Sequence, residues 1–415
     1  MTQELFIKHR EAILDLMKDN SVLFEFNRPN PNDGAVFNYK YDENRNYFYL
    51  TGLLEYENIV ILQKIDGNKS SMILINPYDE YKAKWVGAAL SKEEVTEITG
   101  IKNVRYLDSF NSLINQYSKI VENIYLDFIP NNSHKLNDDE LLAKDIKDHF
   151  PWINILNSRP LFTKARTVKS EEEINEMRKA ISITNEGIKN ILRHMGPKYE
   201  YQLESYFDQA IKFNGGTGYA FPTIAAAGDN ACCLHYMDNN SKAKDGDLIL
   251  FDLGSSVNMY CSDISRTFPV NGKFTKRQKE LYNIVLKGQE LVFNNAKPGI
   301  TTKELNQILR DYYKVELKKI GLIKEGTEEE VSKYYFHGVS HHIGLDCHDL
   351  CEYTPLKAGC IISNEPGLYI AEEGIGIRIE DDVLITENGA EWLSKDIIKT
   401  VEDIEKFIKE NKVND

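Results

Sequence analysis

Carboxylates lie inside short apolar runs in the second half of the chain, and this feature restricts the folds that the chain can adopt. Asp252 stands near the end of the run LILFDL, and Asp263 follows it in MYCSDISRTF. Glu365 comes directly after the strand-like run CIISN. Burying an ionised carboxylate is costly unless a cation or hydrogen bonds compensate its charge. The fold must therefore gather these groups in a polar cleft or around a cation.

The run 375–386 gives the same indication. Its isoleucines alternate with Gly376, Arg378 and Glu380. Because side chains alternate between the two faces of a strand, we expect Arg378 and Glu380 on one face of a single strand. Two charged neighbours on one face of an apolar strand favour a polar cleft over open solvent.

Plainer alternatives stay open for the two aspartates. Asp252 could be a turn or capping residue before Gly254, since aspartate is common in turns. Asp263 could be an ion-pair partner of Arg266, three residues further along the chain.

The pattern of predicted elements indicates two domains. A chain of 415 residues exceeds the size at which a single core usually stops growing. The first part alternates β-rich runs (71–76, 124–129) with polar helical stretches (91–99), which predicts an α/β domain. The signature of a helix start at Ser170, with Glu173 completing a capping box, puts the boundary near 158–170. We therefore expect domains at 1–165 and 166–415.

The second domain combines helices with short strands. Helices are predicted over 171–194, 200–214, 276–296 and 301–319. The runs 248–253, 360–363, 367–370 and 375–386 are β-branched and bounded by Gly or Asp, as is typical of paired antiparallel strands. This pattern predicts an α+β domain that carries its acidic residues on strands.

Composition excludes several classes of partner. The formal charge of −14, without a basic patch, disfavours nucleic acid and anionic lipid. Residues Met1 to Leu16 lack the apolar stretch of a signal peptide, and no run is long enough to span a membrane, so we expect a cytoplasmic protein. The six cysteines show no metal-finger spacing and are expected as small buried thiols: Cys232, Cys233, Cys261, Cys347, Cys351 and Cys360.

Histidines cluster beside the carboxylates. Four of the nine fall between His337 and His348, in HGVSHHIGLDCH, and His235 lies in the loop-like CCLHYMDNN. A single histidine is more often structural than a ligand. Clustered imidazoles near carboxylates favour a metal site, because imidazole suits transition metals and carboxylate oxygens can bridge two ions.

The ordered motifs HGVSH, LDCHD, EPGLY and RIEDD resemble those of the pita-bread metallopeptidases, and specifically the Xaa-Pro aminopeptidase (aminopeptidase P) family. The segment YDENRNYFYLTG looks like part of the N-terminal domain of that family. The resemblance covers the whole chain. It implies an α/β N-terminal domain followed by an α+β pita-bread catalytic domain with a curved antiparallel sheet.

The resemblance also implies two divalent metal ions. The residue matching Asp252 binds one ion, those matching His341 and Glu365 bind the other, and those matching Asp263 and Glu380 bridge both. Four carboxylates nearly cancel two divalent charges and leave room for a bridging hydroxide as the nucleophile. Oxygen-rich ligation with one histidine suits manganese best, while cobalt, zinc or iron could occupy the same ligands.

Roles for the other site residues come from the same resemblance. Glu365 would shuttle the proton, while His235 and His348 would hold the substrate and stabilise the tetrahedral intermediate. His337, Tyr369 and Arg378 match residues that line or support a proline pocket. The plainer alternative for these three is packing and an internal salt bridge.

The implied activity is removal of the first residue from peptides whose second residue is proline. A dipeptide-specific relative (prolidase), a metal-free binding module and a creatinase-like hydrolase remain alternatives. Relatives of this kind are dimers or tetramers, so a homo-oligomer is expected. Three positions depart from the family pattern without removing a ligand: Asn46, Cys347 and Asn364.

Overall fold

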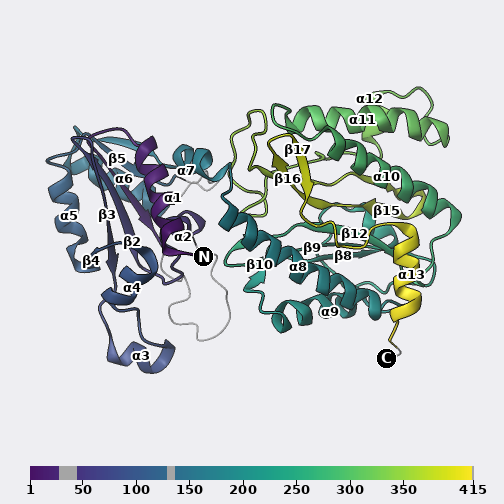
Figure 1. Cartoon of the computed structure of the whole chain (residues 1–415), viewed down its shortest axis with the longest axis horizontal. Helices are drawn as coiled ribbons and strands as arrows, with labels where there is room; N and C mark the ends of the chain where they lie inside the picture. The colour runs from purple at the N-terminus through teal and green to yellow at the C-terminus, as the bar shows by residue number, and fades with distance from the viewer. Residues whose placement is uncertain (28–43, 129–135, 414–415) are drawn as a thin grey trace. The chain divides into compact units, whose positions relative to one another are not determined.

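A computed structural model describes residues 1–27, 44–128 and 136–413. The chain forms two compact units, Met1–Ala165 and Arg166–Asp415 (Figure 1). Each unit has its own apolar core. Among the described residues, no helix is long and apolar enough to cross a membrane.

The first unit is built on a six-stranded mixed sheet with the strand order β4-β3-β2-β1-β5-β6. The central strands β1, β2 and β3 pair antiparallel, whereas β4, β5 and β6 join the sheet by parallel pairing. The strands are β1 Ser21–Phe26, β2 Ile59–Ile65, β3 Asn68–Ile75, β4 Asn103–Tyr106, β5 Asn123–Leu126 and β6 Asn154–Asn157. This mixed sheet confirms the predicted α/β class of the first part.

The helices of the first unit begin at side chains that cap their free N–H groups. Ser91 and Asn137 each form a capping box with a glutamate three residues later. The helices are α1 Gln3–Leu16, α2 Arg45–Thr51, α3 Glu80–Val86, α4 Lys92–Thr99, α5 Phe110–Tyr117, α6 Asp138–His149 and α7 Arg159–Arg166. Buried side chains of the sheet and of α5 and α6 form the core of this unit.

Described pairings in the second unit are all antiparallel. Strands group as β12-β9-β8, β13-β16-β17, β14-β15 and β11-β10-β7. Their bounds are β7 Gly218–Tyr219, β8 Ile224–Ala227, β9 Leu248–Leu253, β10 Ser255–Val257, β11 Tyr260–Cys261, β12 Ile264–Pro269, β13 Ile361–Asn364, β14 Gly367–Ile370, β15 Ile375–Arg378, β16 Asp381–Thr386 and β17 Gly389–Trp392. The predicted α+β class is confirmed.

Helices cover these strands on two sides (Figure 1). Helices α8 and α9 pack together and contact β10 and β8, while α10 packs on α11 and contacts β13, β15 and β17. The bounds are α8 Glu171–Arg193, α9 Glu200–Phe213, α10 Lys276–Asn295, α11 Thr302–Lys319, α12 Glu328–Ser332 and α13 Val401–Asn411. Ser170 and Glu173 form the predicted capping box at the start of α8.

One strand prediction is wrong in a way that affects the site. The run 375–386 forms two strands, β15 and β16, and Glu380 lies in the break between them. There the backbone N–H of Glu380 donates to the carbonyl of Ser265 on β12, 3.0 Å away. Residues 41–43 of the YDENRNYFYLTG segment and Ile129 of the run 124–129 lie outside the described residues.

The expectation of small buried thiols holds for only part of the cysteines. Cys261 and Cys360 are buried, Cys232, Cys347 and Cys351 are partly exposed, and Cys233 is exposed. Cys232 is the last residue of a short 3-10 turn, Gly228–Cys232, and Cys233 follows it. The periodicity of the sequence does not predict this turn.

Candidate metal centre

The predicted site residues come together around one pocket of about 590 Å³ in the second unit. Nine of them line it, and Tyr369 does not: Asp252, Asp263, His341, Glu365, Glu380, His235, His348, His337 and Arg378. They come from six different stretches of chain, so only the tertiary fold unites them.

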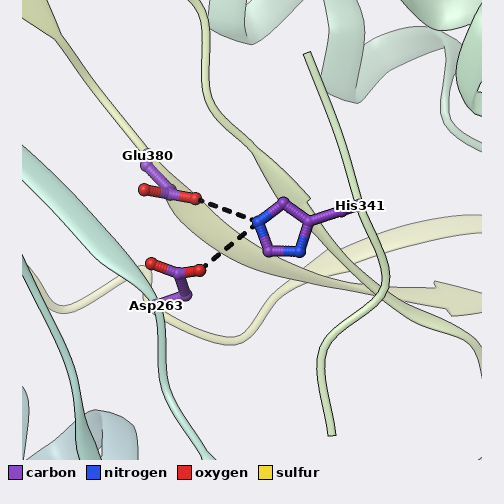
Figure 2. A group of neighbouring side chains, drawn as sticks. All are labelled: Asp263, His341 and Glu380. Carbon is purple, nitrogen blue, oxygen red and sulfur yellow. Dashed lines mark ion pairs between the residues drawn. The ribbon is translucent and has the colours of Figure 1, made fainter. Parts of the chain in front are cut away.

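Asp263, His341 and Glu380 point toward one another (Figure 2). Each offers one ligand atom, and these three atoms lie within 4.8 Å of one another. The Nε2 atom of His341 is 3.4 Å from Oδ2 of Asp263 and 4.0 Å from Oε1 of Glu380. Both carboxylates are almost fully buried, with 4% and 2% exposure. The imidazole therefore faces two buried carboxylates that come from separate stretches of chain.

Glu365 and Asp252 line the same pocket as this group. Oε1 of Glu365 is also 3.4 Å from Nε2 of His341, and it accepts a hydrogen bond from Ser363 at 3.1 Å. Asp252 lies on β9, where its Oδ2 accepts a hydrogen bond of 2.6 Å from Arg378. All five predicted metal ligands thus line one pocket.

Negative charge accumulates in this buried site. Burial, followed by the charges of Asp263, Glu365 and Asp252, raises the pKa of Glu380 well above its ordinary value. Burial also raises the pKa of Glu365 to about 7, and the positive charges of His341 and Arg378 oppose that shift. Burial alone would lower the pKa of His341, but Asp263 and Glu365 outweigh it and raise this pKa to about 9.

This donor set fits divalent cations. Buried carboxylates repel one another unless a cation compensates them. Carboxylate oxygens with one imidazole are ligands that manganese, iron, cobalt and zinc accept. The uncompensated negative charge favours an ion among Asp263, His341 and Glu380. The short distances between their three ligand atoms favour it as well.

Arg378 connects the predicted ligands to Tyr369 and His337 through hydrogen bonds. Its Nη1 donates to the hydroxyl of Tyr369 at 3.0 Å, and that hydroxyl lies 2.9 Å from Nε2 of His337. Burial, followed by the charge of Arg378, lowers the pKa of His337 to about 3. His337 is therefore neutral at physiological pH. Tyr369 lies behind His337 and Arg378 and can position both.

His348 and His235 complete the lining of the pocket. The rings of His348 and His341 have centroids 4.1 Å apart. Burial, followed by the charge of His341, lowers the pKa of His348. His235 is exposed, in the loop after the turn Gly228–Cys232. Both imidazoles can reach a substrate in the pocket.

Ser265 is a site residue that the sequence reasoning missed. Its Oγ lies 2.8 Å from Oε2 of Glu380, 3.0 Å from Oδ1 of Asp252 and 2.7 Å from Nε of Arg378. Ser265 follows Asp263 by two positions, so a period of two would have placed both side chains on one face of the strand.

The apolar wall of the pocket was also missed. It is formed by Phe221, Ile224, Leu234 and Met237. These residues surround the loop of His235, but no charge or motif distinguishes them from ordinary core residues.

The plainer alternatives for the two aspartates do not hold. Arg266 pairs with Asp381 at 2.7 Å, and both side chains are fully buried. Within the described residues, no ion pair joins Arg266 to Asp263. Asp252 lies inside β9, not in a turn or helix cap.

Two of the departures from the family pattern take distinct places in this unit. Cys347 lines the pocket, and its Sγ is 2.9 Å from Oδ2 of Asp263. Asn364 is buried and donates to the carbonyl of Gln289 on α10, at 2.9 Å. In the first unit, Asn46 donates to Oδ2 of Asp127 at 2.8 Å. Only Cys347 can influence the pocket directly.

Comparison with known proteins gives two family matches. Residues 175–387 match the model of metallopeptidase family M24, and residues 6–125 match that of the aminopeptidase P N-terminal domain. The first match covers all five predicted metal ligands, and the second lies in the first unit.

Similar proteins match over nearly the whole chain. The Xaa-Pro aminopeptidase of Escherichia coli K12 is 32% identical, over 98% of this chain and 97% of its own length. A solved structure from Bacillus anthracis, described as an aminopeptidase P, has a TM-score of 0.96 and 41% identity, with all of both chains covered. Proline aminopeptidase P II from Yersinia pestis has a TM-score of 0.91 and 30% identity, covering 99% of this chain and all of that one. These likenesses confirm the pita-bread fold.

Proposed function

This chain belongs to metallopeptidase family M24, and from that membership we propose that two divalent metal ions enable it to remove the first residue from peptides whose second residue is proline. It is a metalloaminopeptidase of the Xaa-Pro type. The metal-free binding module and the creatinase-like hydrolase are thereby set aside. We assign unit 166–415 as the catalytic domain and unit 1–165 as the N-terminal domain of aminopeptidase P type.

The observation that carries the proposal is the convergence of Asp263, His341 and Glu380 within 4.8 Å. Asp252 and Glu365 line the same pocket, and the proposal takes all five residues as the ligands of two ions. Divalent ions held there would lower the pKa of a shared water and polarise the scissile carbonyl. Manganese is our proposal for the ion, because most of the donors are carboxylate oxygens.

Proton transfer is assigned to Glu365. A prolyl peptide nitrogen carries no hydrogen, so it must gain a proton before it can leave. Glu365 lies at the pocket wall beside His341 and accepts a hydrogen bond from Ser363, which fixes its carboxylate. It accepts the proton of the attacking water and delivers it to the prolyl nitrogen.

The remaining histidines and Arg378 are assigned to the substrate. His235 and His348 hold the peptide and stabilise negative charge on the carbonyl oxygen. His337 and Arg378 line the part of the pocket assigned to proline, and Tyr369 positions them through its hydroxyl. Because burial and Arg378 lower the pKa of His337 to about 3, its uncharged ring suits an apolar pyrrolidine ring.

Substrate length separates this proposal from a prolidase. The purified enzyme, supplied with manganese, is given the dipeptide Ala-Pro and the tripeptide Ala-Pro-Ala, and release of alanine is followed by chromatography. We expect cleavage of the tripeptide with a kcat/KM at least about 100 times that of the dipeptide. Cleavage of the dipeptide with the tripeptide left intact would establish the prolidase alternative.

Two further properties stay predictions from the sequence. These are a homo-oligomeric state, as a dimer or tetramer, and a cytoplasmic location. Sedimentation of the purified protein at several concentrations measures the first of them.

A further inference from the structure

A second pocket, of about 420 Å³, adjoins the catalytic pocket. The two share Pro222 and Met237 in their linings. We call the second pocket the acidic annex. Its other lining residues are Tyr201, Glu204, Tyr219, Thr223, Asp238 and Asn239. The two pockets are therefore direct neighbours across Pro222 and Met237.

The annex carries negative charge without a cationic partner. Glu204 projects from α9, beside β8, and Asp238 lies in the loop that follows His235. The residues that line the annex include two carboxylates and no basic side chain. Within the described residues, neither Glu204 nor Asp238 forms an ion pair, unlike several exposed carboxylates of this chain.

Glu204 is held in place and partly desolvated. The amide of Asn239 donates to its Oε2 at 3.0 Å, and the same amide donates to the carbonyl of Thr223 at 2.8 Å. Burial, with a smaller contribution from the charge of Asp208, raises the pKa of Glu204 above its ordinary value. A cation beside Glu204 would reverse that shift.

An unsatisfied hydroxyl also points to a ligand. Thr223 lines the annex and is only 4% exposed, and its Oγ1 has no hydrogen-bond partner in the described part of the chain. A buried polar group without a partner is costly, and a ligand that donates a hydrogen bond would remove that cost.

Aromatic rings complete the surroundings. Tyr201 and Tyr219 are half exposed, and the ring of Tyr201 stacks on Tyr199 with centroids 5.3 Å apart. Carboxylates together with the faces of tyrosine rings are the groups that bind ammonium and guanidinium ions.

The geometry points to the acidic annex as a specificity subsite for the cationic side chain of a lysine or arginine in the peptide. This inference rests on the proposed function, since the annex acts on peptides that the neighbouring pocket holds. The cationic residue is either the first residue of the peptide or the residue after proline, because the annex adjoins a pocket that holds both.

The test compares arginine with citrulline, which has nearly the same shape and no charge. Manganese-loaded enzyme is given Arg-Pro-Ala, citrulline-Pro-Ala, Ala-Pro-Arg, Ala-Pro-citrulline and Ala-Pro-Ala. We expect arginine to exceed citrulline in kcat/KM by about tenfold at one of the two positions, mainly through KM. The position that shows the preference identifies the residue that enters the annex.

Variants connect this preference to the annex. Glu204→Gln keeps an acceptor for Asn239, and Asp238→Asn removes the second charge. In each variant, the ratio of kcat/KM for the arginine peptide to kcat/KM for the citrulline peptide should fall toward one. The control Glu402→Gln changes an exposed position on α13 and should leave this ratio as in the wild type. A ratio near one at both positions in the wild type, or a preference that survives both annex variants, overturns the inference.

A binding measurement separates this inference from the proposed function. Calorimetry follows the same peptides binding to chelator-treated protein, in which no cleavage occurs. If the manganese-loaded enzyme cleaves none of the peptides but the arginine peptide still binds more tightly than its citrulline counterpart, the annex stands and the proposed activity fails. If Ala-Pro-Ala is cleaved but neither assay prefers arginine, the activity stands and the annex inference fails.

Discussion

Ser265 is the side chain on which the positions of three charged groups depend. Its hydroxyl lies within hydrogen-bond distance of Asp252, Glu380 and Arg378. A hydroxyl has a single proton, so it can donate to only one carboxylate at a time while accepting from Arg378. Ser265 therefore fixes the relative placement of two predicted metal ligands and of the arginine between the metal centre and Tyr369.

Replacing Ser265 by alanine should weaken metal binding and activity together. We expect a loss of about 10- to 100-fold in kcat/KM or in metal affinity, as is usual when a group that orients ligands is removed. Metal titration followed by calorimetry, with the tripeptide assay in parallel, measures both. Ser265→Thr retains the hydroxyl and should keep more of the metal affinity than Ser265→Ala. Equal metal affinity in the alanine variant and the wild type would show that the hydroxyl does not orient the ligands.

Glu380→Gln should separate stability from activity. In the absence of metal, the buried Glu380 carboxylate costs free energy, since burial and three neighbouring carboxylates raise its pKa. An amide of the same shape avoids that cost, so the metal-free variant should melt about 2 to 4 °C above the metal-free wild type. Tripeptide cleavage should fall by at least about 1,000-fold. A variant that melts lower and retains activity would contradict the assigned role.

At the scale of elements, a buried ion-pair group anchors the histidine-rich loop to the start of the second unit. Asp349, directly after His348, pairs with Lys169 at 2.9 Å and also with Arg166. Asp346 pairs with the same arginine at 2.6 Å. These contacts join the loop to the segment before α8, so the position of His348 depends on them.

The acid stability of the protein should depend on Asp349. Burial alone would raise its pKa, but the charges of Arg166 and Lys169 outweigh burial and hold the pKa below 3.8. Since the folded pKa is lower than the unfolded one, this group stabilises the fold at neutral pH. The stabilisation is lost as the pH falls below about 4.

Chemical denaturation from pH 7 to pH 2.5 tests this contribution. Asp349→Asn leaves two buried cations short of a partner and should cost about 3 to 5 kcal/mol at pH 7. The free energy of unfolding of this variant should also depend less on pH below 4. If the free energy of unfolding depends equally on pH below 4 in the variant and in the wild type, Asp349 is not a source of the acid sensitivity.

Periodicity and capping predicted most elements of the second unit but not the break at Glu380. The predicted helix at 171–194 is α8, and 367–370 is β14. Isoleucine alternates with Gly376, Arg378 and Glu380 as far as the break itself, so the local pattern alone favours one strand through Glu380. The break arises because β15 pairs with β14 whereas β16 pairs with β13 and β17, and such non-local pairing is not encoded in the local pattern.

At the scale of the whole molecule, the resemblance named the proposed metal ligands and the charged pocket residues from sequence, whereas the apolar wall and the acidic annex could not be named in that way. Carboxylates in apolar strands are conspicuous because they are costly to bury. The apolar wall around His235 and the acidic annex consist of ordinary residue types, and only the tertiary fold brings α9, β8 and the loop after His235 together. The strand order of the first unit was equally inaccessible, since parallel pairing of β1 with β5 joins distant segments.

Metal binding should stabilise the catalytic unit as well as activate it. Ions that bind only the folded state add about 2.7 kcal/mol at a free concentration 100 times Kd. Five ligands from separate stretches of the second unit would contribute to that stabilisation.

Titration of metal-free protein with manganese tests the central claim most directly, with cleavage of Ala-Pro-Ala measured at each addition. If Asp252, Asp263, His341, Glu365 and Glu380 hold two ions, activity should be absent at the start and reach its plateau at about two equivalents of manganese. Full activity in the metal-free protein, or a tripeptide left uncleaved at every manganese concentration, would contradict it.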